Sequence, residues 1–269
     1  MTHVYALVNQ KGGVGKTTTA VNLGAYLAAK GQRVLLIDID PQANATSSLG
    51  FDKQQVKRST YHILIDEVPL PQTIQLTKRL RLDLAPSSSA LAGAEVELVE
   101  LAERERRLKR ALAEVQTNYD YVLIDCPPSL GLLTVNALTA AQGVLVPVQC
   151  EYLALEGLSQ LMNTIQLVRK ALNPGLIVRG LIMTMYDSRM KLAQQVVNEA
   201  RAHFGNRVFD ILIPRSVRLG EAPSFGEPIL SYAPTSSGGV AYDQLADELL
   251  NTDRAADAQL AARTTVPVA

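Results

Sequence analysis

Short apolar runs alternate along the chain with longer segments in which apolar residues recur every three or four positions. The short runs predict buried β-strands at residues 4–8, 33–38, 80–85, 119–125, 144–148, 177–184 and 208–213. The longer segments predict helices at residues 16–30, 90–115 (continuous or broken), 130–141, 153–172, 191–204 and 239–250. Strands that alternate with helices indicate βαβ units. We therefore predict an α/β fold with a mostly parallel sheet covered by helices on both faces.

The alternating pattern also bears on domain organisation. A length of 269 residues fits one large domain or two small ones. No repeat or low-complexity linker divides the pattern, so we predict a single domain over residues 1–251. Residues 252–269 are rich in alanine and predict a mobile C-terminal tail.

Composition and charge exclude several classes of protein. Hydrophobic residues make up 47% of the chain and charged residues 19%, which excludes an intrinsically disordered protein. Lys+Arg and Asp+Glu both number 26, so the chain is not a globally basic nucleic-acid binder, although a local basic patch is compatible with it. Two cysteines cannot form a disulfide framework and indicate a reducing compartment. Residues 126–150 carry no charge, but their prolines and amides oppose a membrane span.

A glycine-rich segment lies between the first predicted strand and the first predicted helix. It reads Asn-Gln-Lys-Gly-Gly-Val-Gly-Lys-Thr-Thr over residues 9–18. Backbone N–H groups of such a loop can bind phosphate oxygens, Lys16 can reach the β- and γ-phosphates, and the Thr17 hydroxyl can ligand Mg²⁺. The strict phosphate-loop pattern requires glycine at position 10. This chain has Gln10 there, followed by a second lysine, Lys11.

Two acidic segments follow predicted buried strands. They are Asp-Ile-Asp-Pro-Gln from Asp38 and Asp-Cys-Pro-Pro from Asp125. Ligands of open α/β sheets bind at the carboxyl ends of the strands, where both segments are expected. Asp125 is a candidate Mg²⁺ ligand, Asp38 a candidate for supporting Mg²⁺ through a water, and Asp40 a candidate for orienting an attacking water. The alternative is that these carboxylates only cap turns before proline.

The glycine-rich loop resembles the deviant Walker A loop of the ParA/MinD ATPases. Further segments resemble chromosomal ParA proteins of the Soj type, namely residues 38–46, 92–95, 125–136, 148–152, 213–218 and 221–224. The resemblance extends to the end of the helix predicted at residues 239–250. It implies a P-loop ATPase with ATP and Mg²⁺ as cofactors, and an ATP-dependent homodimer in which Lys11 reaches the nucleotide of the second copy.

The resemblance also assigns residues to each part of the expected site. The implied catalytic residues are Lys11, Lys16 and Asp40. The implied nucleotide-binding residues are Gly12, Gly13, Val14, Gly15, Lys16, Thr17, Thr18 and, for adenine, Pro214. The implied metal residues are Thr17, Asp38 and Asp125.

Partners follow from the same resemblance. It implies that the ATP-bound dimer binds double-stranded DNA without sequence preference, and that a ParB-type centromere-binding protein stimulates hydrolysis and release. The matching basic residues are Arg189, Arg215 and Arg218; the last two share a face if their segment is helical. The residues alone fit ordinary surface arginines equally well. The implied location is the cytoplasm, in association with the nucleoid.

Three other functions are alternatives to a chromosome-partitioning ATPase. A MinD-like membrane ATPase needs a basic, bulky amphipathic anchor, and residues 254–269 have one leucine and no aromatic residue. An iron–sulfur ATPase needs cluster ligands, whereas Cys126 and Cys150 lack that spacing and are expected to be buried and inert. An ATP-gated DNA scaffold with negligible turnover stays open. The charged run at residues 103–110 is expected to be a solvated helix face; a partner-docking surface or an auxiliary DNA contact is the alternative.

Overall fold

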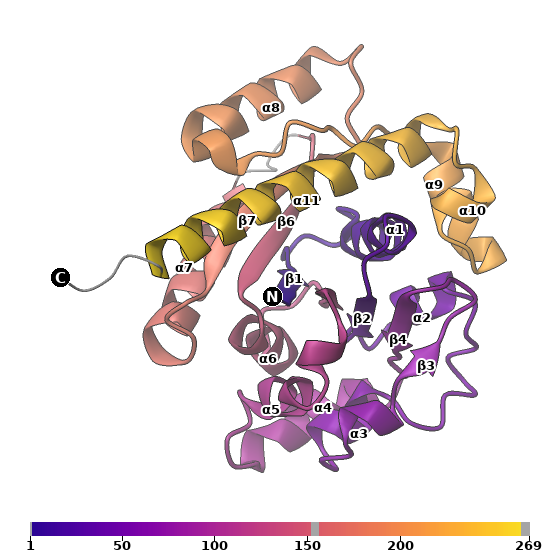
Figure 1. Cartoon of the computed structure of the whole chain (residues 1–269), viewed down its shortest axis with the longest axis vertical. Coiled ribbons are helices and arrows are strands. Elements are labelled where there is room, and N and C mark those ends of the chain that lie inside the picture. Colours follow the sequence, from indigo (N-terminus) through magenta and orange to yellow (C-terminus); the bar gives the residue numbers. More distant parts are fainter. Residues whose placement is uncertain (1, 152–155, 265–269) are drawn as a thin grey trace.

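A seven-stranded sheet forms the centre of the computed structural model, which describes residues 2–151 and 156–264 (Figure 1). The strands lie in the order β3-β4-β2-β5-β1-β6-β7, and only the β3–β4 pair is antiparallel. They are β1 (His3–Leu7), β2 (Val34–Asp38), β3 (Gln75–Leu76), β4 (Leu82–Ala85), β5 (Tyr121–Asp125), β6 (Gly143–Gln149) and β7 (Ile177–Thr184). The predicted α/β fold with a mostly parallel sheet is confirmed.

Helices cover both faces of this sheet (Figure 1). The α-helices are α1 (Lys16–Ala29), α2 (Asn44–Ser48), α3 (Thr60–Leu64), α4 (Leu91–Glu97), α5 (Arg107–Ala113), α6 (Leu132–Ala140), α7 (Glu156–Ala171), α8 (Lys191–Phe204), α9 (Val217–Glu221), α10 (Ile229–Tyr232) and α11 (Ser237–Thr264). Short 3₁₀ turns are η1 (Leu70–Gln72), η2 (Leu98–Glu100), η3 (Gln116–Asn118), η4 (Gly205–Arg207) and η5 (Ala222–Phe225).

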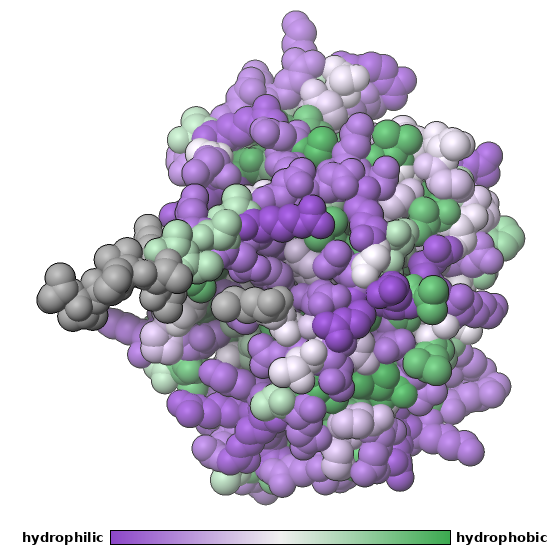
Figure 2. Space-filling model, viewed as in Figure 1, coloured by the Kyte–Doolittle hydropathy of each residue, from purple (hydrophilic) through white to green (hydrophobic). Residues whose placement is uncertain are grey.

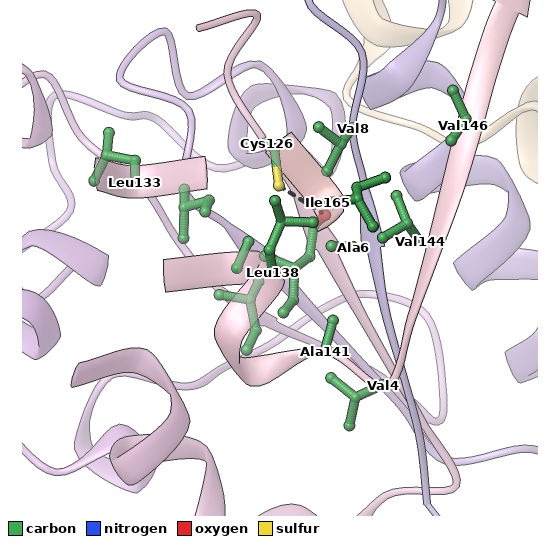
Figure 3. Close-up of a cluster of buried hydrophobic side chains, with 14 of the residues drawn as sticks. Val4, Ala6, Val8, Cys126, Leu133, Leu138, Ala141, Val144, Val146 and Ile165 are labelled. Atoms are coloured by element: carbon green, nitrogen blue, oxygen red, sulfur yellow. Dashed lines mark hydrogen bonds between the residues drawn. The ribbon is translucent and has the colours of Figure 1, made fainter. Parts of the chain in front are cut away.

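Two hydrophobic clusters pack against the sheet, one on each face. Successive side chains of a strand point to opposite faces, so Val4 and Ala6 of β1 enter one cluster, while Tyr5 and Leu7 enter the other. The first cluster joins the sheet to α3–α8, and Figure 3 shows the part where β1 and β6 meet α6 and α7. The second joins it to α1, α2 and α9–α11. This two-sided burial explains why the central strands β1, β2, β5 and β6 are mainly apolar, whereas β3, at the edge, is exposed.

The cysteines and the surface agree with this packing. Cys126 and Cys150 are buried free thiols, as predicted, and burial raises the pKa of both above the ordinary range, that of Cys150 to about 12. On the face drawn in Figure 2, the surface is mainly hydrophilic, with small separate groups of hydrophobic residues. None of the helices that the structure describes combines the length and the hydropathy of a membrane span.

The prediction of a β-strand at residues 208–213 is wrong. Only isolated bridges form there, from Val208 to Leu181 and from Pro214 to Tyr186. The backbone N–H groups of Asp210 and Ile211 instead donate to the two carboxylate oxygens of Glu248 on α11, at 2.7 and 3.1 Å. Glu248 thus interrupts the ladder that an apolar run predicts, although the N–H groups of Phe209 and Ile213 still donate to the Leu181 and Met183 carbonyl oxygens of β7 (3.0 and 2.9 Å).

Two predicted helices also differ in extent. The helix predicted over residues 90–115 is broken into α4, η2 and α5, with Glu103 between them in a left-handed conformation (φ 48°). The last helix was predicted to end at residue 250, but α11 continues to Thr264, so the predicted boundary at residue 251 lies within a helix. The buried Asp253 side chain, bonded to Arg179, anchors this extension. Residues 265–269, and residues 153–155 of another predicted helix, lie outside the described residues.

Candidate functional site

The glycine-rich loop lies between β1 and α1, at the carboxyl ends of the parallel strands. Two side chains fix it to the sheet. The Thr184 hydroxyl at the end of β7 donates to the Val14 carbonyl oxygen (2.8 Å), and the Asn9 amide donates to the Pro147 carbonyl oxygen of β6 (2.7 Å). The Gly13 backbone is left-handed (φ 74°), and a Cβ atom there would meet no atom within 4 Å. The loop is therefore rigidly held, with open space above it.

Lys16 extends into this space as a buried cation. The residue is 7% exposed, and its Nζ lies 3.4 Å from the Lys11 carbonyl oxygen. It forms no ion pair with any residue that the structure describes. Burial lowers the pKa of its amine, against the opposing charges of Asp125 and Asp40. A buried, unpaired ammonium group is suited to an anionic ligand.

Asp125 ends β5 directly beside the loop. Its Oδ2 accepts a hydrogen bond from the Thr17 hydroxyl (2.7 Å), whereas its Oδ1 is buried and has no hydrogen-bond partner among the described residues. Burial, and then the nearby charge of Asp38, raises the pKa of this carboxyl well above its usual range. The hydroxyl and carboxylate oxygens are the donors that Mg²⁺ prefers, and Oδ1 is free to bind. Thr17 and Asp125 therefore fit a magnesium ion.

Asp38 ends the neighbouring strand β2, in register with Asp125. Both of its carboxylate oxygens already accept hydrogen bonds, Oδ1 from the Asp40 N–H (3.1 Å) and Oδ2 from the Thr46 N–H and hydroxyl (2.8 and 2.7 Å). Burial raises the pKa of Asp38 to about 6, although the bonds from Thr46 oppose this rise. Asp38 thus holds the segment that carries Asp40. The support of Mg²⁺ by Asp38 through a water stays a prediction.

Asp40 lies at the edge of the site. It is 6% exposed, and its Oδ1 accepts a hydrogen bond from the Gln42 N–H (2.9 Å). The Ser87 hydroxyl donates to the Asp40 carbonyl oxygen (2.7 Å), and the Ser87 N–H donates to the Thr46 hydroxyl (2.9 Å). Ser87 and Thr46 therefore position Asp40. Sequence reasoning missed both residues, because no local pattern links a serine after β4 to a turn after β2.

A cavity of about 210 Å³ opens beside the loop. Its walls include Gly15 and Thr18 from the loop and α1, Pro214 and Leu219 from the segment around α9, and Tyr242 from α11. The Tyr242 hydroxyl lies 3.0 Å from the Thr19 hydroxyl, which ties α11 to α1. The structure thus brings Pro214 next to the glycine-rich loop, although 199 residues separate it from Gly15 in the sequence. Sequence reasoning did not find Tyr242.

The three predicted DNA-binding arginines are exposed, and each is paired with a carboxylate of its own chain. Arg189 pairs with Asp187 (2.7 Å), Arg215 with Glu151 (3.1 Å) and Arg218 with Glu221 (2.8 Å). Arg218 lies in α9, but Arg215 precedes that helix and Arg189 precedes α8, so the three do not share a helix face.

Lys11 lies near this basic group. Its Nζ is 3.7 Å from Glu151 Oε2, and its side chain is 45% exposed. Glu151 therefore contacts both Lys11 and Arg215, which belong to different sequence motifs. Sequence reasoning assigned no role to Glu151.

Comparison with known proteins identifies relatives over nearly the whole chain. A family model described as an AAA domain matches residues 2–178. The sporulation initiation inhibitor protein Soj of Bacillus subtilis is 56% identical over 249 residues, which cover 93% of this chain and 98% of that protein. The chromosome partitioning protein ParA of Caulobacter vibrioides is 52% identical over 260 residues, or 96% of this chain and 97% of that one.

Solved structures show the same fold. The cobyrinic acid a,c-diamide synthase of Mycobacterium smegmatis, with bound ADP and magnesium, has a TM-score of 0.84 and 41% identity over 94% of this chain and 96% of its own. MinD of Pyrococcus horikoshii, complexed with Mg-ADP, has a TM-score of 0.73 and 26% identity over 93% of this chain and 96% of its own. The fold therefore occurs in proteins that bind magnesium and adenine nucleotides.

Proposed function

Because the chain belongs to the Soj/ParA family of chromosome-partitioning ATPases, we propose that it hydrolyses ATP and uses the ATP-bound state to bind DNA. The observation that carries this proposal is the incomplete polar site around the glycine-rich loop. Lys16 is a buried cation without an ion pair among the described residues, and Asp125 Oδ1 is a buried acceptor without a donor. Magnesium and the phosphates of ATP would complete both.

Each residue then has a role that its position allows. Backbone N–H groups of residues 12–18 and the Lys16 ammonium bind the phosphates. Thr17 and Asp125 hold Mg²⁺, which neutralises charge on the phosphates when it is bound. Asp40 accepts a hydrogen bond from the attacking water and orients it toward the γ-phosphate. The cavity next to Pro214 takes the adenosine part of the nucleotide.

Dimerisation depends on Lys11 in this proposal. The Lys11 ammonium lies on the surface, and its one ion pair among the residues that the structure describes is a long one, to Glu151 (3.7 Å). Exposed ion pairs of this kind contribute about 0–1 kcal/mol, so the side chain can be redirected at little cost. Lys11 reaches the nucleotide of a second copy of the chain and thereby makes dimer formation dependent on ATP.

The dimer binds double-stranded DNA through Arg189, Arg215 and Arg218. Arginines that contact phosphates give binding that depends on salt and not on sequence. A centromere-binding protein of the ParB type stimulates hydrolysis and releases the dimer. The protein acts in the cytoplasm, on the nucleoid.

The test is the binding of a random-sequence DNA duplex, measured by fluorescence anisotropy with ATP, with ADP and without nucleotide over a salt series. Tight binding that requires ATP and weakens steeply with salt is expected. Lys11→Ala should still bind ATP but lose ATP-dependent dimerisation and DNA binding. Equal binding in all three nucleotide states, or none in any, would contradict the DNA-dependent function.

A turnover assay separates an ATPase from an ATP-gated scaffold. Asp40→Ala should bind ATP and DNA but hydrolyse ATP much more slowly, because the attacking water is no longer oriented. If wild type and Asp40→Ala turn over ATP at the same rate, Asp40 does not have the proposed role and the scaffold interpretation is favoured.

A further inference from the structure

The turn between β3 and β4 presents three basic side chains in five residues. It comprises residues 77–81, with the sequence Thr-Lys-Arg-Leu-Arg. Thr77 holds it in shape, because its hydroxyl donates to the Leu82 carbonyl oxygen (2.6 Å) and accepts from the Arg79 N–H (3.0 Å). Lys78 and Arg81 are exposed. The turn is therefore a rigid, outward-facing group of positive charges.

These charges form no ion pairs with the residues that the structure describes. Among the residues that the structure describes, no carboxylate lies within ion-pair distance of Lys78, Arg79 or Arg81. The Arg79 guanidinium donates to the Ser231 hydroxyl, and Arg81 donates to the Gly31 carbonyl oxygen (3.2 Å), both of which are neutral acceptors. In a chain with zero net charge, three adjacent uncompensated cations form a local positive field.

The predicted DNA-binding arginines differ in this respect. Arg189, Arg215 and Arg218 each have a carboxylate partner, which a DNA phosphate must displace. At the β3–β4 turn a phosphate displaces only water or a neutral acceptor. The turn therefore offers an anion more uncompensated charge than the arginines that sequence reasoning selected.

The turn is continuous with the surface that carries Arg218. The Arg79–Ser231 hydrogen bond joins it to α10, and the next residue of α10, Tyr232, donates to Glu221 Oε2 (3.0 Å). Glu221 is the ion-pair partner of Arg218 on α9. In Figure 1, α9, α10 and the β3–β4 hairpin lie along the same side of the molecule. A rod-shaped polyanion such as duplex DNA can contact α9 and the turn together.

We propose that the β3–β4 turn is a second phosphate-contacting element of the DNA-binding surface, with Lys78 and Arg81 as its main contacts. This inference rests on the proposed DNA-binding function. An anionic lipid surface is the alternative partner, because Leu76 and Leu80 beside these charges are 81% and 85% exposed. DNA is favoured by the continuity with Arg218 and by the small number of exposed apolar side chains in the turn.

The test removes two of these charges with Lys78→Gln and Arg81→Gln together. ATP-dependent DNA binding is measured by fluorescence anisotropy over a salt series. The slope of log affinity against log salt should fall by about one unit for each lost phosphate contact, and affinity at moderate salt should fall about tenfold. ATP affinity and ATP-dependent dimerisation should match wild type, which shows that the double variant is folded.

A matched control removes the same charge elsewhere. Arg169 and Lys170 are exposed basic residues with no carboxylate within ion-pair distance among the residues that the structure describes, and they lie in α7, which packs on the other face of the sheet. Arg169→Gln with Lys170→Gln should leave the salt slope unchanged. An equal loss in both double variants, or no loss in the turn variant, overturns the proposal.

A third variant distinguishes lipid from DNA. Leu80→Ser should leave DNA affinity unchanged, and wild type should not bind vesicles of anionic phosphatidylglycerol. Vesicle binding that Leu80→Ser abolishes would overturn the proposal in favour of a membrane contact. If wild type binds no DNA with ATP, the proposed DNA-binding function itself is wrong. If wild type binds DNA and the turn variant binds it equally well, only the role of the turn is wrong.

Discussion

Two buried carboxylates in different regions of the molecule differ in how completely the chain supplies their hydrogen bonds. Near the beginning of β5 and β7, Asp253 of α11 accepts hydrogen bonds from the Tyr5 hydroxyl (2.7 Å), the Tyr121 hydroxyl (3.0 Å) and the Arg179 guanidinium (2.8 and 2.7 Å). At the carboxyl end of β5, Asp125 accepts one hydrogen bond and leaves Oδ1 without a partner. Both residues are almost completely buried.

The difference separates a structural group from a binding group. A buried polar atom without a partner destabilises a protein by about 1–3 kcal/mol, and a ligand that binds the atom offsets this cost. Around Asp253 every partner comes from the chain itself, and the cluster fixes α11 to the sheet. Around Asp125 and Lys16, burial shifts both pKa values toward the neutral forms, which indicates that no partner among residues 2–151 and 156–264 offsets the burial of either charge.

The largest expected effect comes from breaking the satisfied cluster. Asp253→Ala leaves the Arg179 guanidinium, whose side chain is 14% exposed, without its buried partner. Removing one member of a buried ion pair destabilises a protein by about 3–5 kcal/mol. Urea denaturation should show this loss in the free energy of unfolding, while the affinity for ATP measured under native conditions stays within about twofold. Loss of ATP binding by a folded variant would show that the two regions are not independent.

The complementary change at the incomplete site is Lys16→Ala. It should lower ATP affinity by about 100-fold or more, because a charge-assisted contact to phosphate is lost in a buried site. The free energy of unfolding without nucleotide should not fall, since the buried ammonium forms no ion pair with any residue in the described part of the chain. Isothermal titration calorimetry and urea denaturation measure the two effects. A variant that loses stability but keeps its ATP affinity would reverse the assignment of the two regions.

Asp125→Asn tests the incomplete site through pH. The folded-state pKa of Asp125 is raised, so the folded protein binds more protons than the unfolded chain, and wild type loses stability as pH rises above about 4. The amide in the Asp125→Asn variant does not titrate, so the variant does not lose stability in this way as pH rises. Without nucleotide and magnesium, the variant should therefore be more stable than wild type by about 1–3 kcal/mol at pH 8, and by less at pH 5. Its magnesium-dependent ATP binding should weaken.

Urea denaturation at the two pH values measures this difference. Asp253→Asn is the matched control, because it makes the same chemical change in the satisfied cluster and should destabilise the protein at both pH values. If Asp125→Asn is less stable than wild type throughout, Asp125 is held by its surroundings as Asp253 is, and the contrast between the regions does not hold.

The sequence predicted one of these regions and not the other, for a physical reason. The phosphate loop, Asp40 and Asp125 lie in short local patterns whose chemistry is set by adjacent residues and by strand ends. The Asp253 cluster joins side chains from β1, β5, β7 and α11, and each of them is unremarkable in its own segment. The same limit explains the wrong strand at residues 208–213, where Glu248 binds the backbone. Ser87 and Tyr242 were missed for the same reason.

The smallest expected effect comes from removing a single donor from the satisfied cluster. Tyr5→Phe deletes one hydroxyl but leaves Asp253 with hydrogen bonds from Tyr121 and Arg179. Burial, and then the Asp253 charge, raises the pKa of Tyr5, so the hydroxyl stays a neutral donor over the accessible pH range. A hydrogen bond to a charged group contributes about 1.5–3 kcal/mol, but the remaining donors compensate in part, so a loss of about 1–2 kcal/mol is expected.

This loss should be the same from pH 6 to pH 9, because the hydroxyl does not titrate there. Tyr5→Phe combined with Asp253→Ala should add little to Asp253→Ala alone, since the acceptor is already gone. Urea denaturation of the two single variants and the double variant measures the coupling. Full additivity would mean that the Tyr5 hydroxyl stabilises the protein through its other partners, the Arg179 guanidinium (3.3 Å) and the His3 imidazole (3.4 Å), and not through Asp253. The cluster would then be less tightly coupled than its geometry indicates, and the contrast with the phosphate site would rest on the Tyr121 hydroxyl and the Arg179 guanidinium.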